Sequence, residues 1–281
     1  MADLAFATLN HSPLVDPHTD VLTQVAAAAD ARYTMLSPDV FSIRAHLAAG
    51  GSLAQLADAL SERQVSCLDL AGLTIGADET RTKHEADELL EVARALSCTW
   101  VQVRVVDKVD DRIRNLFGWS ADRFGASGVG LAVEFSPLTE VKTIADARDV
   151  LAGARAEART GVIVDTWHFF RGDDRWPDLE ALPVDELAFV QFSDGLPAGN
   201  KPGHDTLHRR ALPGHGEFDL DRFSACLRDK GYRGPVSVEV LSEELRALPV
   251  EEFARRTMDT SLPFWRRSPG TIRGQRRQND Q

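Results

Sequence analysis

The chain has few of the features that mark secreted, membrane or thiol-metal proteins. Its three cysteines, Cys67, Cys98 and Cys226, are widely spaced and form no CxxC pair, which indicates neither a disulfide framework nor a thiolate zinc site. No apolar run approaches the ~18 residues of a transmembrane helix. The start, MADLAFATLN, lacks the basic residues and apolar core of a signal peptide. We therefore expect buried free thiols in a cytoplasmic protein with no membrane partner.

Excess basic charge and a dinucleotide fingerprint are also missing. The net charge is −11, and an acidic surface repels phosphates, so nucleic acid is disfavoured as a partner. No GxGxxG follows the first β-rich run, which removes the dinucleotide-binding form of an open sheet. The length of 281 residues suits one large barrel, because α/β barrels run to about 250 residues as a single unit.

Short β-rich runs recur along the chain, with helical patterns between them. Several of the runs are continuously apolar, as in strands that are buried on both faces. The expected strands are Leu4–Leu9, Tyr33–Ser37, Val65–Leu70, Trp100–Val105, Gly130–Phe135, Gly161–Thr166, Ala188–Phe192 and Val236–Val240.

The intervening segments carry helix signals. Ser52 is an expected N-cap, and Thr143 with Asp146 forms a start that resembles a capping box. Eight strands that alternate with helices predict an α/β fold, a single (β/α)8 TIM barrel over residues 1–265 that ends in a helix at Val250–Trp265. An open doubly wound sheet is the alternative. The polar, basic segment Arg266–Gln281 is predicted to be a disordered tail.

Four oxygen-bearing side chains end four successive β-rich runs. They are Glu134, Asp165, Gln191 and Glu239, in GLAVEF, GVIVDTWHFF, AFVQFSD and PVSVEV. Neighbouring strands lie about 4.8 Å apart, so the ends of four such strands can converge on one ion. Three carboxylates and an amide are hard oxygen donors, the set that Mg²⁺ or Mn²⁺ prefers. Capping of loops is the alternative role for each residue taken singly.

The second half of the chain resembles the xylose isomerase-like TIM-barrel superfamily, often called the sugar phosphate isomerase/epimerase family. The resemblance runs from Leu131 to Leu241 and is carried by AVEFSP, GVIVDTWHFFR, FVQFSD, ALPGHGEFDL and SVEVLS, in the order of the family. The family includes ketohexose 3-epimerases, inosose and 3-dehydroshikimate dehydratases and endonuclease IV. The endonuclease branch is disfavoured, because its multi-zinc cluster needs more histidine ligands and its surface is basic.

The resemblance implies roles for individual residues. Glu134, Asp165, Gln191 and Glu239 would be the metal ligands, and His168 would reach the substrate from the family's DxxH. Gln191 stands where most members have histidine, although the 3-dehydroshikimate dehydratase branch also has glutamine there. An amide in place of an imidazole favours Mg²⁺ or Mn²⁺ over Zn²⁺.

The activity that the resemblance implies is proton removal next to a carbonyl, through an enediolate that the metal stabilises. In an isomerase or epimerase Glu134 and Glu239 would act as acid and base; in a dehydratase His168 would be the base. A sugar-binding barrel without catalysis is a third alternative. The substrate is expected to be a small polyhydroxy carbonyl compound, with Arg210 and Asp194 as further contacts. An anionic substrate and a homo-oligomer both remain open.

Overall fold

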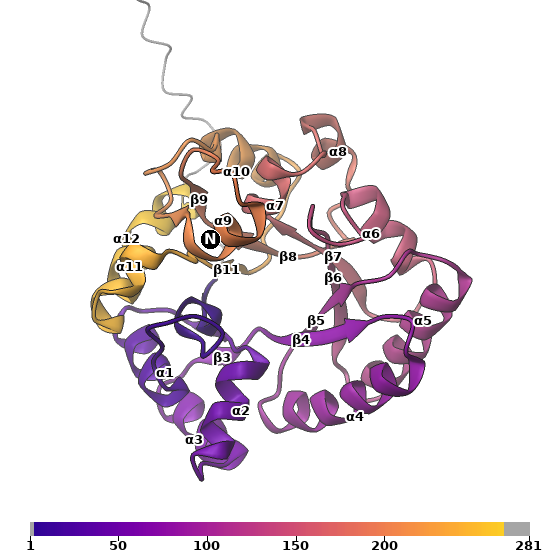
Figure 1. Ribbon diagram of the computed structural model, residues 1–281, viewed down its shortest axis with the longest axis horizontal. Helices are drawn as coiled ribbons and strands as arrows, with labels where there is room; N and C mark the ends of the chain where they lie inside the picture. Colours follow the sequence, from indigo (N-terminus) through magenta and orange to yellow (C-terminus); the bar gives the residue numbers. More distant parts are fainter. Residues whose placement is uncertain (1–2, 267–281) are drawn as a thin grey trace, which may run out of the picture.

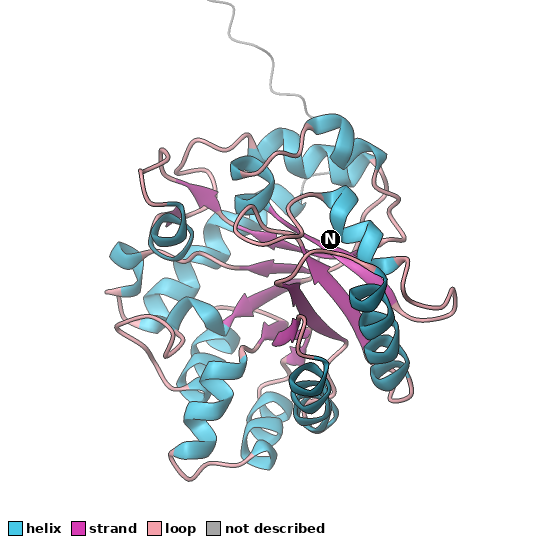
Figure 2. Ribbon diagram, turned by 45° about the vertical axis from the view of Figure 1, so that its right-hand side comes forward, coloured by secondary structure: helices cyan, strands magenta, loops and turns pink. Residues whose placement is uncertain are grey.

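Parallel strands form the centre of the molecule and helices surround them in the computed structural model, which describes residues 3–266 (Figures 1 and 2). The strands are β1 (Leu4–Ala7), β2 (Met35–Ser37), β3 (Ser66–Cys67), β4 (Asp69–Ile75), β5 (Trp100–Val105), β6 (Gly130–Glu134), β7 (Thr160–Asp165), β8 (Leu187–Phe192), β9 (Asp194–Gly195), β10 (Arg210–Ala211) and β11 (Val236–Val238).

The helices fill the connections between these strands. They are η1 (Thr8–His11), α1 (Val21–Asp30), α2 (Val40–Ala48), α3 (Leu53–Glu62), α4 (Glu79–Ala95), α5 (Asp111–Gly125), α6 (Ile144–Leu151), α7 (Thr166–Arg171), α8 (Trp176–Ala181), α9 (Pro202–His208), α10 (Leu220–Asp229), α11 (Glu243–Arg246) and α12 (Val250–Arg266).

The main sheet closes into a barrel, in which the short strands β3 and β4 together take the place of one strand, so that the barrel has eight strand positions. Its order is β3-β2-β1-β11-β8-β7-β6-β5-β4, with parallel neighbours throughout. The strands β3 and β4 are the two edges of this sheet, and only Leu68 separates them in the chain. Leu68 hydrogen-bonds to the neighbour of each edge strand, which closes the barrel. Its N–H donates to Leu36 O at 2.8 Å, and its carbonyl accepts from Trp100 N at 3.0 Å. Since β3 and β4 form one interrupted strand, the prediction of a (β/α)8 barrel is confirmed.

We call the end of the barrel at which the parallel strands finish its mouth. The observed strands differ from the expected ones mainly at this end. The first strand stops at Ala7, and a 3-10 helix takes residues 8–11. The expected strand Val65–Leu70 is interrupted at Leu68 and continues to Ile75. The last strand ends at Val238, so Glu239 lies just beyond it.

Side-chain caps define the helix starts that the sequence marks most clearly. Ser52 Oγ accepts from Gln55 N at 3.2 Å while Ser52 N donates to Gln55 Oε1 at 2.9 Å. Thr143 and Asp146 form the same reciprocal pair before α6. Helix α6 then ends at Leu151, well before β7 begins at Thr160. Helix α12 includes Arg266, and the rest of the predicted tail lies outside the described residues.

The inside of the barrel has an apolar floor at the end opposite the mouth. Along each strand every second side chain points into the barrel. The residue two positions after a floor residue therefore also points inward, in the next layer toward the mouth. The floor residues are packed together and are mostly small or aromatic: Ala5, Leu68, Trp100, Ala132, Ile163, Ala188 and Phe189, with Met35 packed against them. Among residues 3–266, no helix is both long and apolar enough to cross a bilayer.

Candidate active site

The four predicted strand-end residues lie in the polar layer above this floor. Glu134, Asp165 and Gln191 each stand two residues after a floor residue on the same strand, and Glu239 follows β11 directly. All four side chains are buried. The barrel therefore holds three carboxylates and an amide in its interior, at the end where TIM barrels have their active sites.

Glu134, Asp165 and His168 form the tightest group. One ligand atom from each lies within 4.8 Å of the others. His168 Nε2 is 3.7 Å from Glu134 Oε1 and 3.8 Å from Asp165 Oδ2. His168 lies in α7, which begins directly after β7. Asp165 is the N-cap of this helix, because its Oδ1 accepts a hydrogen bond from Trp167 N at 2.6 Å. The short helix thus returns the imidazole to the mouth.

Arg210 joins Asp165 to Glu239. Its Nη1 lies 2.8 Å from Asp165 Oδ2 and 3.1 Å from Glu239 Oε2, and its Nε donates to Thr206 O. The Arg210 side chain is 2% exposed. Arg210 is therefore part of the cluster itself, where it partly balances two buried carboxylates, rather than a cation on a loop over the mouth.

Gln191 links the cluster to the opposite wall. Its Nε2 is 3.3 Å from both Glu239 Oε1 and Gln102 Oε1. These contacts use the amide N–H groups and leave Gln191 Oε1 buried, with no hydrogen-bond partner in the described chain. An unpartnered amide oxygen beside two carboxylates is well placed to serve as a ligand for a hard cation.

Burial shifts the protonation of these groups toward their neutral forms. Burial, reinforced by the charge of Asp165, raises the pKa of Glu134 from 4.5 to about 7. Burial also raises the pKa of Glu239 to about 8, although Arg210 opposes the shift. The pKa of His168 falls to about 4 because its ring is buried and faces Arg210. At neutral pH the imidazole is neutral and the two glutamates can hold or release protons.

Asp194 was expected to contact the substrate, but its carboxylate binds backbone N–H groups of a loop instead. Its Oδ1 accepts from Gly195 N and Phe218 N, and its Oδ2 accepts from Gly214 N and Gly216 N, at 2.8–3.0 Å. Four backbone donors thus occupy both oxygens. Asp194 holds the loop after β10 against β9, and we do not include it among the substrate contacts.

Two polar residues on β5 complete the mouth, and the interpretation of the sequence missed both. Gln102 hydrogen-bonds Glu134 as well as Gln191. Arg104 pairs in register with Glu134 and is exposed, so its guanidinium is free to meet a ligand. A signal was available: in WVQVRV the two polar residues alternate with valines, which predicts one face turned to the barrel interior.

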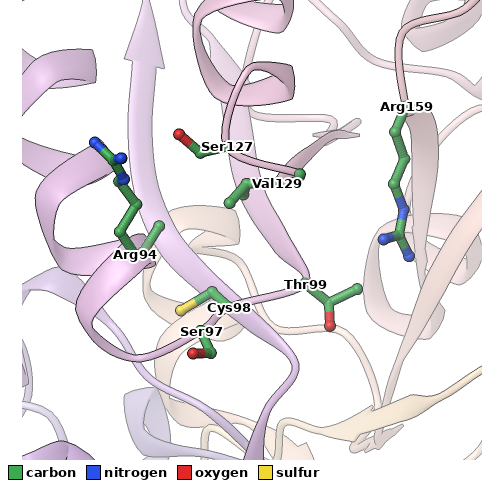
Figure 3. A pocket seen from close by; sticks show the side chains of 9 residues that line it. Arg94, Ser97, Cys98, Thr99, Ser127, Val129 and Arg159 are labelled. Carbon is green, nitrogen blue, oxygen red and sulfur yellow. The ribbon is translucent and has the colours of Figure 1, made fainter.

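A cavity of about 300 Å³ opens beside His168. Trp167, Leu138 and Arg171 line it together with Pro202 and Asp205 of α9. A larger cavity of about 440 Å³ lies elsewhere, with Arg94 and Arg159 on opposite sides of it (Figure 3). Its residues Thr99, Val129 and Arg159 directly precede β5, β6 and β7, so it is at the floor end of the barrel. TIM barrels have their active sites at the carboxyl ends of the strands, so the smaller cavity, which includes His168, belongs to the candidate active site.

Comparison with known proteins identifies the family of the chain. The family model described as xylose isomerase-like TIM barrel matches residues 24–267. An inosose isomerase of Halalkalibacterium halodurans is 30% identical over 139 residues, 48% of each chain. A 3-dehydroshikimate dehydratase of Pseudomonas aeruginosa is 33% identical over 128 residues, which are 44% of this chain and 20% of that protein. The matched regions thus span about half, and about a fifth, of these relatives.

A solved structure is similar over nearly the whole chain. The IOLI protein, described with a bound zinc atom, superposes with a TM-score of 0.82 at 19% identity and covers 94% of this chain and 98% of its own. At that identity the similarity concerns the fold.

Proposed function

Because the chain belongs to the xylose isomerase-like TIM barrel family, we propose that it is a divalent-metal-dependent isomerase or epimerase of a small polyhydroxy ketone. The observation that carries the proposal is the convergence of Glu134, Asp165, Gln191 and Glu239 in one buried layer, with neutral His168 beside them. The similarity to inosose isomerases supports a cyclic polyol ketone as the substrate.

The donor set fits a divalent cation. Three buried carboxylates repel one another, and Arg210 alone supplies too little positive charge to balance them. Gln191 Oε1 has no other partner among residues 3–266. Glu134, Asp165, Gln191 and Glu239 would hold the ion, and their oxygens favour Mg²⁺ or Mn²⁺. When bound, such an ion supplies Lewis acidity that makes a proton next to the substrate carbonyl easier to remove.

The protein's own groups then move the proton. Glu134 and Glu239 come from strands on different sides of the cluster, β6 and the end of β11, with β7 and β8 between them. One glutamate in its ionised form accepts the α-proton, and an enediolate remains. The other, in its protonated form, returns a proton to the neighbouring carbon or to the opposite face. The first outcome is isomerisation and the second is epimerisation.

His168 and Arg210 position these groups. The neutral His168 ring can donate to or accept from a substrate hydroxyl at the edge of the cluster. Arg210 fixes Asp165 and Glu239 through contacts of 2.8 and 3.1 Å, so the carboxylates keep their geometry while a proton is transferred.

Proton exchange tests the proposal directly. Inososes and ketohexoses would be incubated with the enzyme and Mn²⁺ in deuterated water and followed by NMR. We expect deuterium uptake without a change in formula other than the isotope, and we expect Glu239→Gln to abolish it. Tight binding of a sugar with no exchange by the wild type would instead identify a binding protein without catalysis.

A dehydratase is the second candidate, and Arg104 favours it. The exposed guanidinium stands at the mouth beside Glu134 and would pair with a carboxylate on the substrate ring. His168 would then take the α-proton, and a β-hydroxyl would accept a proton from a protonated glutamate of the cluster and leave as water. The similarity to 3-dehydroshikimate dehydratases supports this alternative. In the same NMR experiment, 3-dehydroshikimate would lose water if the dehydratase is the true activity.

A further inference from the structure

A second group of metal-binding side chains lies outside the carboxylate cluster. It consists of His204 and His208 on α9 and Glu243 at the start of α11. One ligand atom from each lies within 4.8 Å of the others. We propose that these three residues form a separate cation site that takes a transition-metal ion such as Zn²⁺, Co²⁺ or Ni²⁺.

The two histidines have the spacing that chelation on a helix requires. They are four residues apart, so both side chains lie on the same face of α9. Their rings are stacked, with centroids 4.4 Å apart and planes 26° apart. His208 Nδ1 is buried and has no hydrogen-bond partner in residues 3–266.

Glu243 supplies the third ligand from a different connection. It begins α11, in the loop between β11 and α12, whereas α9 lies in the loop between β9 and β10. The contact between α9 and α11 brings the carboxylate to the imidazoles. Arg246, one turn later, opposes a cation, but its guanidinium is directed to Asn10 O and Leu207 O at 3.0 Å. Asp205, 3.9 Å from His204, adds negative charge.

The ligand types and the space fit a borderline metal better than Mg²⁺. Two imidazoles and one carboxylate form the ligand set of many zinc sites. Tetrahedral bonds of 2.0–2.2 Å would bring the three atoms to about 3.4 Å from one another. The atoms now lie within 4.8 Å of one another, and His204 and Glu243 are exposed, so small side-chain rotations would bring them to that separation. Water would occupy the fourth position.

Metal at this site would join two loops at the mouth. Helix α9 also lines the cavity beside His168, through Pro202 and Asp205. Both α9 and α11 lie on the same side of the barrel (Figure 1). An ion shared between them would hold the α9 wall of the cavity in place by a link that does not touch the reacting groups.

Zinc stoichiometry tests the site. By equilibrium dialysis, we expect His204→Ala/His208→Ala to bind one Zn²⁺ fewer per chain than the wild type. The control His84→Ala removes an exposed histidine that lies 3.2 Å from Glu88 on α4 and has no third ligand within residues 3–266. It should bind as the wild type does. Equal stoichiometry in the wild type and the double variant would overturn the proposal.

Two further measurements keep the test decisive if that variant folds poorly. Glu243→Gln changes one exposed group, and we expect it to weaken Co²⁺ binding at least about tenfold and to alter the tetrahedral Co²⁺ absorption band. In a chain that carries Asp165→Asn and Glu239→Gln, one Co²⁺ should still bind with that band. An unchanged band in Glu243→Gln would refute the ligand set, whatever the fate of the proposed isomerase activity.

Discussion

The two ends of the barrel interior are built on the same strands but differ in chemistry. At the floor, Trp100, Ala132, Ile163 and Phe189 pack against one another. Two residues further along the same strands stand Gln102, Glu134, Asp165 and Gln191. Because side chains two positions apart share a face, a single change of residue type along each strand turns a packed floor into a polar mouth.

This difference separates stability from chemistry. The floor buries apolar surface and offers no proton donor or ligand, so its contribution is to the free energy of folding. The mouth buries carboxylates, which lowers stability unless a cation and Arg210 balance them. Substitutions in the two layers should therefore affect different measurements.

The largest effect is expected at the mouth. Glu239→Gln removes the carboxylate that we propose as a proton-transfer group and a metal ligand, while it keeps the shape of the side chain. We expect kcat to fall by about a thousandfold or more, with an unchanged circular dichroism spectrum. The measurement is turnover at saturating Mn²⁺, with exposed Glu88→Gln as the control. Full activity in Glu239→Gln would refute the assignment of the site.

The floor should respond in the opposite way. Phe189 is fully buried, and Phe189→Ala leaves a cavity that we expect to cost about 3–5 kcal/mol of unfolding free energy. Urea denaturation measures the loss, and Phe189→Leu should lose less. Activity per folded molecule should stay near that of the wild type. A large loss of kcat with normal stability would show that the two layers are not separate.

Asp69, a buried carboxylate at the start of β4, should make stability depend on pH. Burial raises its pKa from 3.8 to about 7, and a hydrogen bond from Ser37 opposes the shift. The folded state therefore binds a proton more tightly than the unfolded state. The stability that this group contributes is fully present below about pH 4. It is lost as the pH rises to about 7, by on the order of 4 kcal/mol, because one pKa unit corresponds to about 1.4 kcal/mol. Denaturation across this range should show a flatter profile for Asp69→Asn, and parallel profiles would contradict the prediction.

The smallest effect concerns substrate choice at the rim. Arg104→Gln should raise KM about tenfold for a substrate that carries a carboxylate and leave KM for a neutral polyol ketone unchanged. Arg123→Gln, which removes an arginine paired with Asp87 on the outer surface, is the matched control. Equal effects on both substrates would exclude Arg104 as the anion contact.

The sequence determined the strand alternation, the barrel and the four side chains at the strand ends. These follow from local patterns, because period-two burial and the parallel order place the ends of successive strands side by side. The caps at Ser52 and Thr143 were predictable for the same reason, since their partners are three residues away. Arg104 was within reach of that reasoning too.

The tertiary structure alone decided what the loops do. The sequence did not indicate that Arg210 lies between Asp165 and Glu239, or that Asp194 is used entirely by the loop near Gly214. The meeting of His208 with Glu243 also depends on two loops that the sequence separates. Strand patterns fix which face a side chain takes, whereas a loop side chain takes its direction from packing against distant segments.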